Sequence, residues 1–151
     1  MGRALLRVHI VKCSGEFRFI TAKEECEAIL EKAFQIEPRL CYEGIGVYEN
    51  DELVFKGRKF RESQQKLMMA TEQIVACESW LVPQYRTKSV TRHRNSYTLK
   101  HIVEEELKTH VSNGAFCAMA IGLDWKYTVD GPNIFINIVK DLYHYTGGPV
   151  A

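Results

Sequence analysis

The sequence predicts an α+β protein, and three observations lead to that class. Short stretches in which apolar and polar residues alternate predict β-strands, and longer stretches with apolar residues three and four apart predict helices. Gly, Pro and Asp-Gly turn signals separate these stretches. Hydrophobic residues make up 46% of the chain and charged residues 26%, which is typical of a globular protein. We therefore expect antiparallel hairpins packed on helices, in the order β-β-α-β-β-α and then α-α-β-β.

The first half begins with a hairpin and a helix. Residues 5–13 alternate and are rich in β-branched side chains, and residues 16–20 follow them after a Ser-Gly turn, which predicts two paired strands. Thr21 and Glu24 have the spacing of a capping box, so we expect a helix to begin there. Pro38 marks the end of that helix.

A second hairpin and a long helix complete the first half. Residues 45–48 and 53–55 flank the polar stretch 49–52, which predicts two further strands and a turn. Apolar residues at helical spacing predict one continuous helix over 61–80. Gly44, where the chain enters the first of these strands, indicates a bulge or a close approach of two backbones.

The second half begins with a basic connection. Residues 84–95 are polar and basic and show no periodicity, which predicts a loop or arm. Ser96 is expected to cap one helix, and Ser112 or Asn113 a second, shorter one. A final hairpin is expected around the Asp-Gly turn that follows.

The chain length favours a single compact domain over residues 1–151. The basic connection 84–96 is the one internal boundary that the sequence suggests. It would join an α+β part, 1–83, to a helix-turn-helix-like part, 97–140.

Motifs of catalysis, metal binding and membrane insertion are missing from the sequence. The five cysteines lie far apart without a C-x-x-C pair, which indicates a reducing compartment, and Cys117 lies in a run of small apolar residues typical of a core. His101 and Glu105 share a helix face, but the second histidine of a zinc hydrolase helix is absent. We therefore expect no catalytic residue, no metal and no cofactor.

Basic residues interrupt the apolar N-terminal run, and no stretch reaches the roughly 20 apolar residues of a membrane helix, so we expect a cytoplasmic protein without a membrane partner.

The charges are unevenly distributed although the net charge is only +1. Acidic residues dominate 16–52, whereas 56–61 and 86–100 carry cations and no acid. If these two basic clusters met on one surface, they would neutralise several phosphates, which is the source of most non-specific nucleic-acid affinity. We therefore predict a non-enzymatic nucleic-acid-binding protein, with DNA favoured over RNA as the ligand. The predicted contact residues are Lys56, Arg58, Lys59, Arg61, Arg86, Lys88, Arg92, Arg94 and Lys100.

The order of elements after Ser96 is that of a winged helix-turn-helix, in which the second helix enters the major groove and a hairpin touches the backbone. Residues 114–120 argue against this role, because their side chains are small and apolar and carry almost nothing that reads a base edge. Such a run is more typical of a helix buried in the fold. Double-stranded RNA-binding domains also place basic residues at the start of a helix after a hairpin, and they are a minor alternative.

The last third of the chain resembles the ending of small uncharacterised proteins carried by bacteriophages and other bacterial mobile elements. The resemblance lies in S-Y-T-L-K-H-I-V-E-E-E (96–106), V-S-N-G-A-F-C-A-M-A-I-G-L (111–123) and G-P-N-I-F-I-N-I (131–138). It implies the cytoplasm of a bacterial host and one of two roles, a regulator acting on DNA or a host-directed inhibitor such as a counter-defence protein. It implies no catalytic residues.

The second of these roles is the main alternative. An inhibitor would bind a basic groove on a host protein through an acidic surface, and the charge would mainly speed the encounter. The residues for such a surface are Glu24, Glu25, Glu27, Glu31, Glu49, Asp51 and Glu52. An enzyme would require His93 or His101 in a deep pocket beside a carboxylate. A homodimer is compatible with each of these roles.

Overall fold

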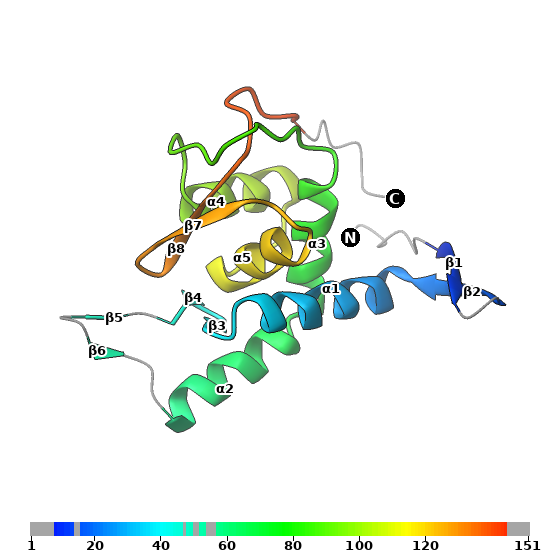
Figure 1. The fold of residues 1–151 in the computed structure, drawn as a ribbon, viewed down its shortest axis with the longest axis horizontal. Coiled ribbons are helices and arrows are strands. Elements are labelled where there is room, and N and C mark those ends of the chain that lie inside the picture. The colour runs from blue at the N-terminus through cyan, green and yellow to red at the C-terminus, as the bar shows by residue number, and fades with distance from the viewer. Residues whose placement is uncertain (1–7, 14–15, 47, 50–51, 54–56, 145–151) are drawn as a thin grey trace.

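The computed structural model describes residues 8–13, 16–46, 48–49, 52–53 and 57–144, and these contain five helices and eight short strands (Figure 1). In chain order the elements are β1 (Val8–Cys13), β2 (Glu16–Thr21), α1 (Ala22–Ile36), β3 (Leu40–Cys41), β4 (Gly44–Ile45), β5 (Tyr48–Glu49), β6 (Glu52–Leu53), α2 (Gly57–Met68), α3 (Thr71–Leu81), α4 (Ser96–Leu107), α5 (Asn113–Gly122), β7 (Tyr127–Asp130) and β8 (Asn133–Ile136). The strands pair as antiparallel two-stranded hairpins. The predicted α+β class is therefore confirmed.

Helix α5 is the centre of the fold. It lies among α1, α3 and α4 in Figure 1, and it also contacts β3, β4 and β8. All of its residues are buried, as expected for a helix that is apolar on every side. The interpretation of 114–120 as a tightly buried helix is confirmed. The helix consequently has no exposed face with which to enter a DNA groove, as the second helix of a winged helix-turn-helix would.

Two glycines let α5 approach the backbone of its neighbours. A Cβ atom on Gly114 would lie 1.9 Å from the carbonyl oxygen of Cys41, and one on Gly122 would lie 2.3 Å from that of Ile29. Both separations are far inside van der Waals contact, so any larger residue would push β3 or α1 away. The Gly114 N–H also donates to the Tyr42 carbonyl at 2.9 Å, which joins the first turn of α5 to the β3–β4 turn.

The side chain of Asn113 ties three parts of the chain together. Its amide nitrogen lies 3.0 Å from the Glu43 carbonyl, 3.0 Å from the Pro132 carbonyl and 3.0 Å from Asn133 Oδ1. These acceptors belong to the β3–β4 turn and to the β7–β8 turn. Gly44 has φ +132°, and a Cβ there would lie 2.1 Å from the Pro132 oxygen, so the predicted close backbone approach at Gly44 is confirmed.

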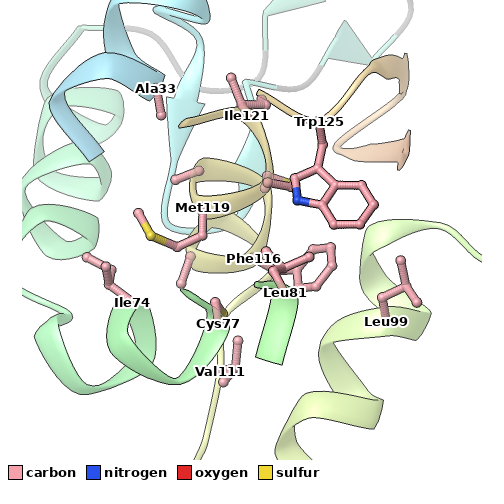
Figure 2. Packing of buried hydrophobic residues seen from close by; sticks show 14 of the residues in the cluster. Ala33, Ile74, Cys77, Leu81, Leu99, Val111, Phe116, Met119, Ile121 and Trp125 are labelled. Atoms are coloured by element: carbon pink, nitrogen blue, oxygen red, sulfur yellow. The ribbon is translucent and has the colours of Figure 1, made fainter. Parts of the chain in front are cut away.

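Apolar side chains from both sides of the basic connection form one cluster around α5 (Figure 2). Phe116 and Met119 project from α5, Ile74 comes from α3 and Leu99 from α4, and Trp125 follows α5 on the way to β7. All five are buried. Because burial of one large apolar side chain contributes about 1.5–3 kcal/mol, this cluster is the main source of stability.

The first predicted hairpin is confirmed, since β1 pairs with β2 along the full length of both strands. Helix α1 ends at Ile36, two residues before Pro38, also as predicted. Of the second predicted hairpin, Tyr48 lies opposite Leu53, whereas Ile45 pairs with Leu40 instead. Residues 47, 54 and 55 of the predicted strands lie outside the described residues. A further hairpin, β3–β4, is not indicated by the sequence, because strands of two residues contain no alternation to detect.

The prediction of one helix over 61–80 is wrong, because the chain breaks into α2 and α3 at Met69 and Ala70. Ala70 has φ −82° and ψ 52°, outside the helical region. Gln64 of α2 donates to the carbonyls of Pro38 and Leu40 at 3.0 Å each, whereas α3 packs on α5. The two helices therefore dock on different neighbours, and the apolar periodicity continues across the break.

The cap of α4 also differs from the prediction. Asn95, not Ser96, accepts the hydrogen bond from the N–H of Thr98, at 3.0 Å. Ser96 is buried inside the first turn, where its hydroxyl accepts a hydrogen bond from the N–H of Ile134 at 3.0 Å. The predicted cap of α5 is confirmed, since Ser112 Oγ accepts from the third residue of the helix at 3.0 Å.

Replacing Gly114 with Ala is expected to lower the free energy of unfolding by about 1–3 kcal/mol or to prevent folding, because the new methyl group meets backbone atoms that cannot rotate away. Urea denaturation of the purified variant measures the loss. Gly131→Ala is the control: that glycine has φ +58° with open space around it, so only local strain of about 1 kcal/mol is expected. Equal losses in the two variants would contradict the close approach of α5.

Candidate nucleic-acid interface

The basic connection 84–95 lies against the last hairpin along most of its length. Thr87 N–H donates to the Asn137 carbonyl at 2.7 Å, and Thr91 N–H donates to the Ile136 carbonyl at 3.1 Å. The Val139 N–H donates back to the connection, at 3.1 Å from the Tyr85 carbonyl. These bonds fix the backbone of the connection beside β8 and the residues after it. The backbone positions from which its basic side chains extend are therefore defined.

Arg86 closes the C-terminal end of α5. Its guanidinium group donates to the carbonyls of Leu123 and Asp124 at 2.8 and 2.9 Å, and it lies 4.3 Å from the centre of a Trp125 ring. A cation at this position satisfies carbonyls that the helix leaves free and is favoured by the helix dipole. Arg86 is therefore structural as well as exposed.

The side chains of Arg92 and Lys126 lie over the outer face of the last hairpin, and the backbone of Lys88 lies beside them. Lys126 Nζ donates to the Lys88 carbonyl at 2.7 Å, and the Arg92 guanidinium lies 5.8 Å from the centre of the Phe135 ring. Phe135 is opposite Thr128 in the β7–β8 pairing, and Lys126 is two residues before Thr128. Because alternate residues and directly opposed residues share a face, Lys126 and Phe135 are on the same side of the hairpin.

At the end of the connection, Arg94 donates to the Lys140 carbonyl at 3.0 Å. Carbonyl oxygens or an aromatic ring thus hold the side chains of Arg86, Arg92, Arg94 and Lys126, whereas Lys88 and Lys140 contribute backbone carbonyls. Within the described part of the chain, none of them forms an ion pair with a carboxylate. We call these six residues the connection surface: Arg86, Lys88, Arg92, Arg94, Lys126 and Lys140.

Two exposed aromatic rings lie at the edge of the connection surface. Tyr85 is 71% exposed and Tyr143 is 49% exposed. The buried carboxamide of Gln84 bonds both the N–H and the carbonyl of Tyr143, at 3.0 and 2.8 Å, which keeps Tyr143 close to Tyr85. Exposed aromatic side chains beside cations are the groups on which unpaired bases stack.

Lys100 does not belong to this surface. It is only 8% exposed, and its Nζ lies 2.9 Å from Glu104 Oε1. His101 Nδ1 and His110 Nδ1 lie 3.3 and 3.2 Å from the same carboxylate. Burial alone would raise the pKa of Glu104, but the hydrogen bond and the charge of Lys100 outweigh it and hold that pKa below its ordinary value. His101 and His93 are both exposed on the surface.

The first predicted cluster lies elsewhere. Arg58, Lys59 and Arg61 are exposed on α2, and Arg58 Nε bonds Glu62 Oε1 at 2.9 Å. Lys56 lies outside the described residues. In Figure 1, α2 is at the lower left and the connection runs along the top, with α1 and α5 in between. The structure therefore does not bring the two predicted clusters together.

Cys117 is completely buried, as expected from the run of small apolar residues around it. Burial raises the pKa of its thiol to about 12, so a reactive thiolate is not available there. Within the described ranges, no group of three or more His, Cys, Asp or Glu residues is arranged to hold a metal ion. No helix in those ranges is both long enough and apolar enough to cross a bilayer.

Sequence reasoning misses Lys126 and Lys140 as members of the connection surface. Each is a single cation in an otherwise unremarkable stretch, and only the pairing of the connection with the hairpin places it beside Lys88 or Arg94. The alternation in 125–129 is the one signal that places Lys126 on an outer face.

Comparison with known proteins identifies no family for this chain. A scan against protein-family models, a search of curated proteins and a search of solved structures each found no significant match. The candidate site is therefore defined by the side chains of this chain alone.

Replacing Lys100 with Met is expected to lower the free energy of unfolding by about 1–2 kcal/mol at neutral pH, because Glu104 loses its main partner but keeps some solvent. A carboxyl group whose folded pKa is depressed stabilises the fold above its unfolded pKa of 4.5, and this contribution is lost as the pH falls. The difference between variant and wild type should therefore shrink near pH 4. Urea denaturation at the two pH values checks this, and an undiminished difference at the lower pH would contradict the role of the ion pair.

Proposed function

We propose that the protein is a non-enzymatic nucleic-acid-binding protein that contacts phosphates through the connection surface. The observation that carries the proposal is a group of six cations around one hairpin that form no ion pair with a carboxylate in the described residues. Carbonyl oxygens or an aromatic ring hold the side chains of four of them, Arg86, Arg92, Arg94 and Lys126. The proposal keeps nucleic acid as the predicted ligand, with DNA favoured over RNA. The connection surface of six residues replaces the predicted contact surface of nine.

The anchoring of these cations matters for binding. A carbonyl oxygen orients a guanidinium or an ammonium group without cancelling its charge, so the full charge of Arg94 and Lys126 remains available to phosphate. Side chains that are already oriented lose less conformational entropy on binding than free ones do. Asp124, whose carbonyl accepts from Arg86, has its carboxylate paired with Lys32 of α1, which removes one source of repulsion between the surface and a polyanion.

The surface favours phosphates over base edges. Its charged groups are arginines and lysines on the connection and beside the last hairpin, and the helix that might have read the major groove is buried. Contacts of this kind position a nucleic acid but carry little sequence information. We therefore propose weak sequence preference, consistent with a mobile-element protein that acts on DNA, one of the roles that the resemblance of the last third implies.

The double variant Arg92→Gln/Lys126→Gln is expected to bind duplex DNA about tenfold more weakly than wild type at low salt, and to lower the slope of log affinity against log salt by about two. Both side chains are exposed, so folding should be unaffected. Arg86 is left intact because it closes α5. Fluorescence anisotropy with labelled duplex DNA, single-stranded DNA and structured RNA over a salt series measures both quantities.

The matched control for this experiment is Lys59→Gln/Arg61→Gln on α2. It removes the same charge from the other side of the molecule, so its affinity and salt slope should equal those of wild type. An equal loss in the two double variants would mean that only net charge matters. Binding that is insensitive to salt in wild type would exclude phosphate contacts altogether.

A second candidate function is binding to a host protein, and one observation favours it. Glu24, Glu27 and Glu31 follow a single stripe of α1, three and four residues apart, and all three are exposed. An acidic stripe on a helix that packs firmly on the core through its other side is a suitable surface for a basic partner.

If the protein is an inhibitor of this kind, capture from a lysate of the native host should recover one stoichiometric protein. The variant Glu27→Lys/Glu31→Lys should lose that capture, because like charges would then face each other across the contact. The control is Glu72→Lys, an exposed position on α3, which should retain the partner. Loss of capture in the control as well would argue against the α1 stripe.

A further inference from the structure

The break between α2 and α3 leaves a groove on the side of the molecule away from the connection surface. Its volume is about 490 Å³, and its lining includes Tyr42, Glu62, Gln65, Lys66, Met69 and Gln73. The groove is shallow and open to solvent, so it offers a small organic ligand one face to bind against. A single helix over 61–80 would not produce it.

Tyr42 is held in the wall of this groove by its backbone. Its N–H donates to Ser63 Oγ of α2 at 3.0 Å, and its carbonyl accepts from the Gly114 N–H of α5 at 2.9 Å. The Lys66 ammonium lies 4.1 Å from the centre of the Tyr42 ring. The ring and the cation therefore face the groove as one unit.

Gln73 fixes the role of the Tyr42 hydroxyl. Gln73 Oε1 accepts from the Ser112 N–H at 2.8 Å, so its amide nitrogen faces Tyr42 and donates to the hydroxyl oxygen at 3.0 Å. That oxygen already accepts a hydrogen bond, and the phenol proton is left to donate. The hydroxyl oxygen lies at the long distance of 3.5 Å from His110 Nε2, and the other nitrogen of His110 lies against Glu104.

The charges of the groove are not balanced. Glu62 is engaged by Arg58 at 2.9 Å, whereas Lys66 has no ion pair with any carboxylate that the structure describes. The groove thus presents an ammonium group and a phenol O–H with only a long, weak acceptor. Met69, which is 83% exposed, adds an apolar thioether beside them.

We propose that this groove binds a small organic anion. A phosphate or carboxylate group of the ligand accepts hydrogen bonds from Lys66 Nζ and from the Tyr42 hydroxyl, and the apolar part of the ligand lies against Met69. Gln73 is a positioning residue, because it sets the direction of the Tyr42 proton. The proposal is independent of nucleic-acid binding, since none of these residues belongs to the connection surface.

The proposal is tested by NMR titration of the full chain with phenyl phosphate, with benzoate and with phenol as the neutral analogue. We expect saturable shifts, confined to the amides around Tyr42, Lys66 and Gln73, for at least one of the two anions and not for phenol. The stronger anion identifies the preferred head group. Shifts that do not saturate, or that phenol reproduces, would overturn the proposal.

Variants separate the groove from general charge effects. Lys66→Gln is expected to weaken anion binding about tenfold, because a charge-assisted hydrogen bond is lost, and Tyr42→Phe should weaken it while keeping the ring. Lys59→Gln, an equal charge change on the same helix, should bind as wild type does. Thermal unfolding confirms that each variant is folded. Unchanged affinity in the folded Lys66→Gln variant, or an equal loss in Lys59→Gln, would refute the site.

Discussion

The contact of bare backbone against backbone at the two ends of α5 is the constraint on which the rest of the structure depends. Gly114 meets the β3–β4 turn and Gly122 meets α1 with no side chain between them. Such approaches give dense packing, and dense packing makes a core intolerant of added volume. Because α5 also contacts α3, α4 and β8, a shift of this helix would disturb nearly every other packed element.

The two ends of α5 also organise the two candidate sites. At its N-terminal end, Ser112 donates to Gln73 and Gly114 donates to Tyr42, which places the wall of the groove. At its C-terminal end, the carbonyls of the two residues that follow the helix hold Arg86, which places the start of the connection surface. Helix α5 thus contributes to the groove at one end and to the connection surface at the other.

Sequence patterns anticipate the features that are local and fail where distant segments decide the outcome. The first hairpin, the end of α1 before Pro38 and the burial of α5 follow from alternation, a proline and a run of small residues. The break at Ala70 follows from the different partners of α2 and α3, which no periodicity records. Lys100 is a cation of the kind that binds phosphate, but it lies on the inner side of α4 and pairs with Glu104. Positions in space, not residue types, separate the structural cations from the available ones.

The three-way tie made by Asn113 has a consequence for how the molecule assembles. Its partners are separated from it by 70 residues on one side and by 19 and 20 on the other, so loop-closure entropy opposes the tie until long stretches of chain have come together. The tie to the β3–β4 turn closes a much longer loop than the ties to the β7–β8 turn, so its entropic cost is higher. The carboxamide of Asn113 therefore has its full set of hydrogen bonds only when residues from both halves of the chain have come together.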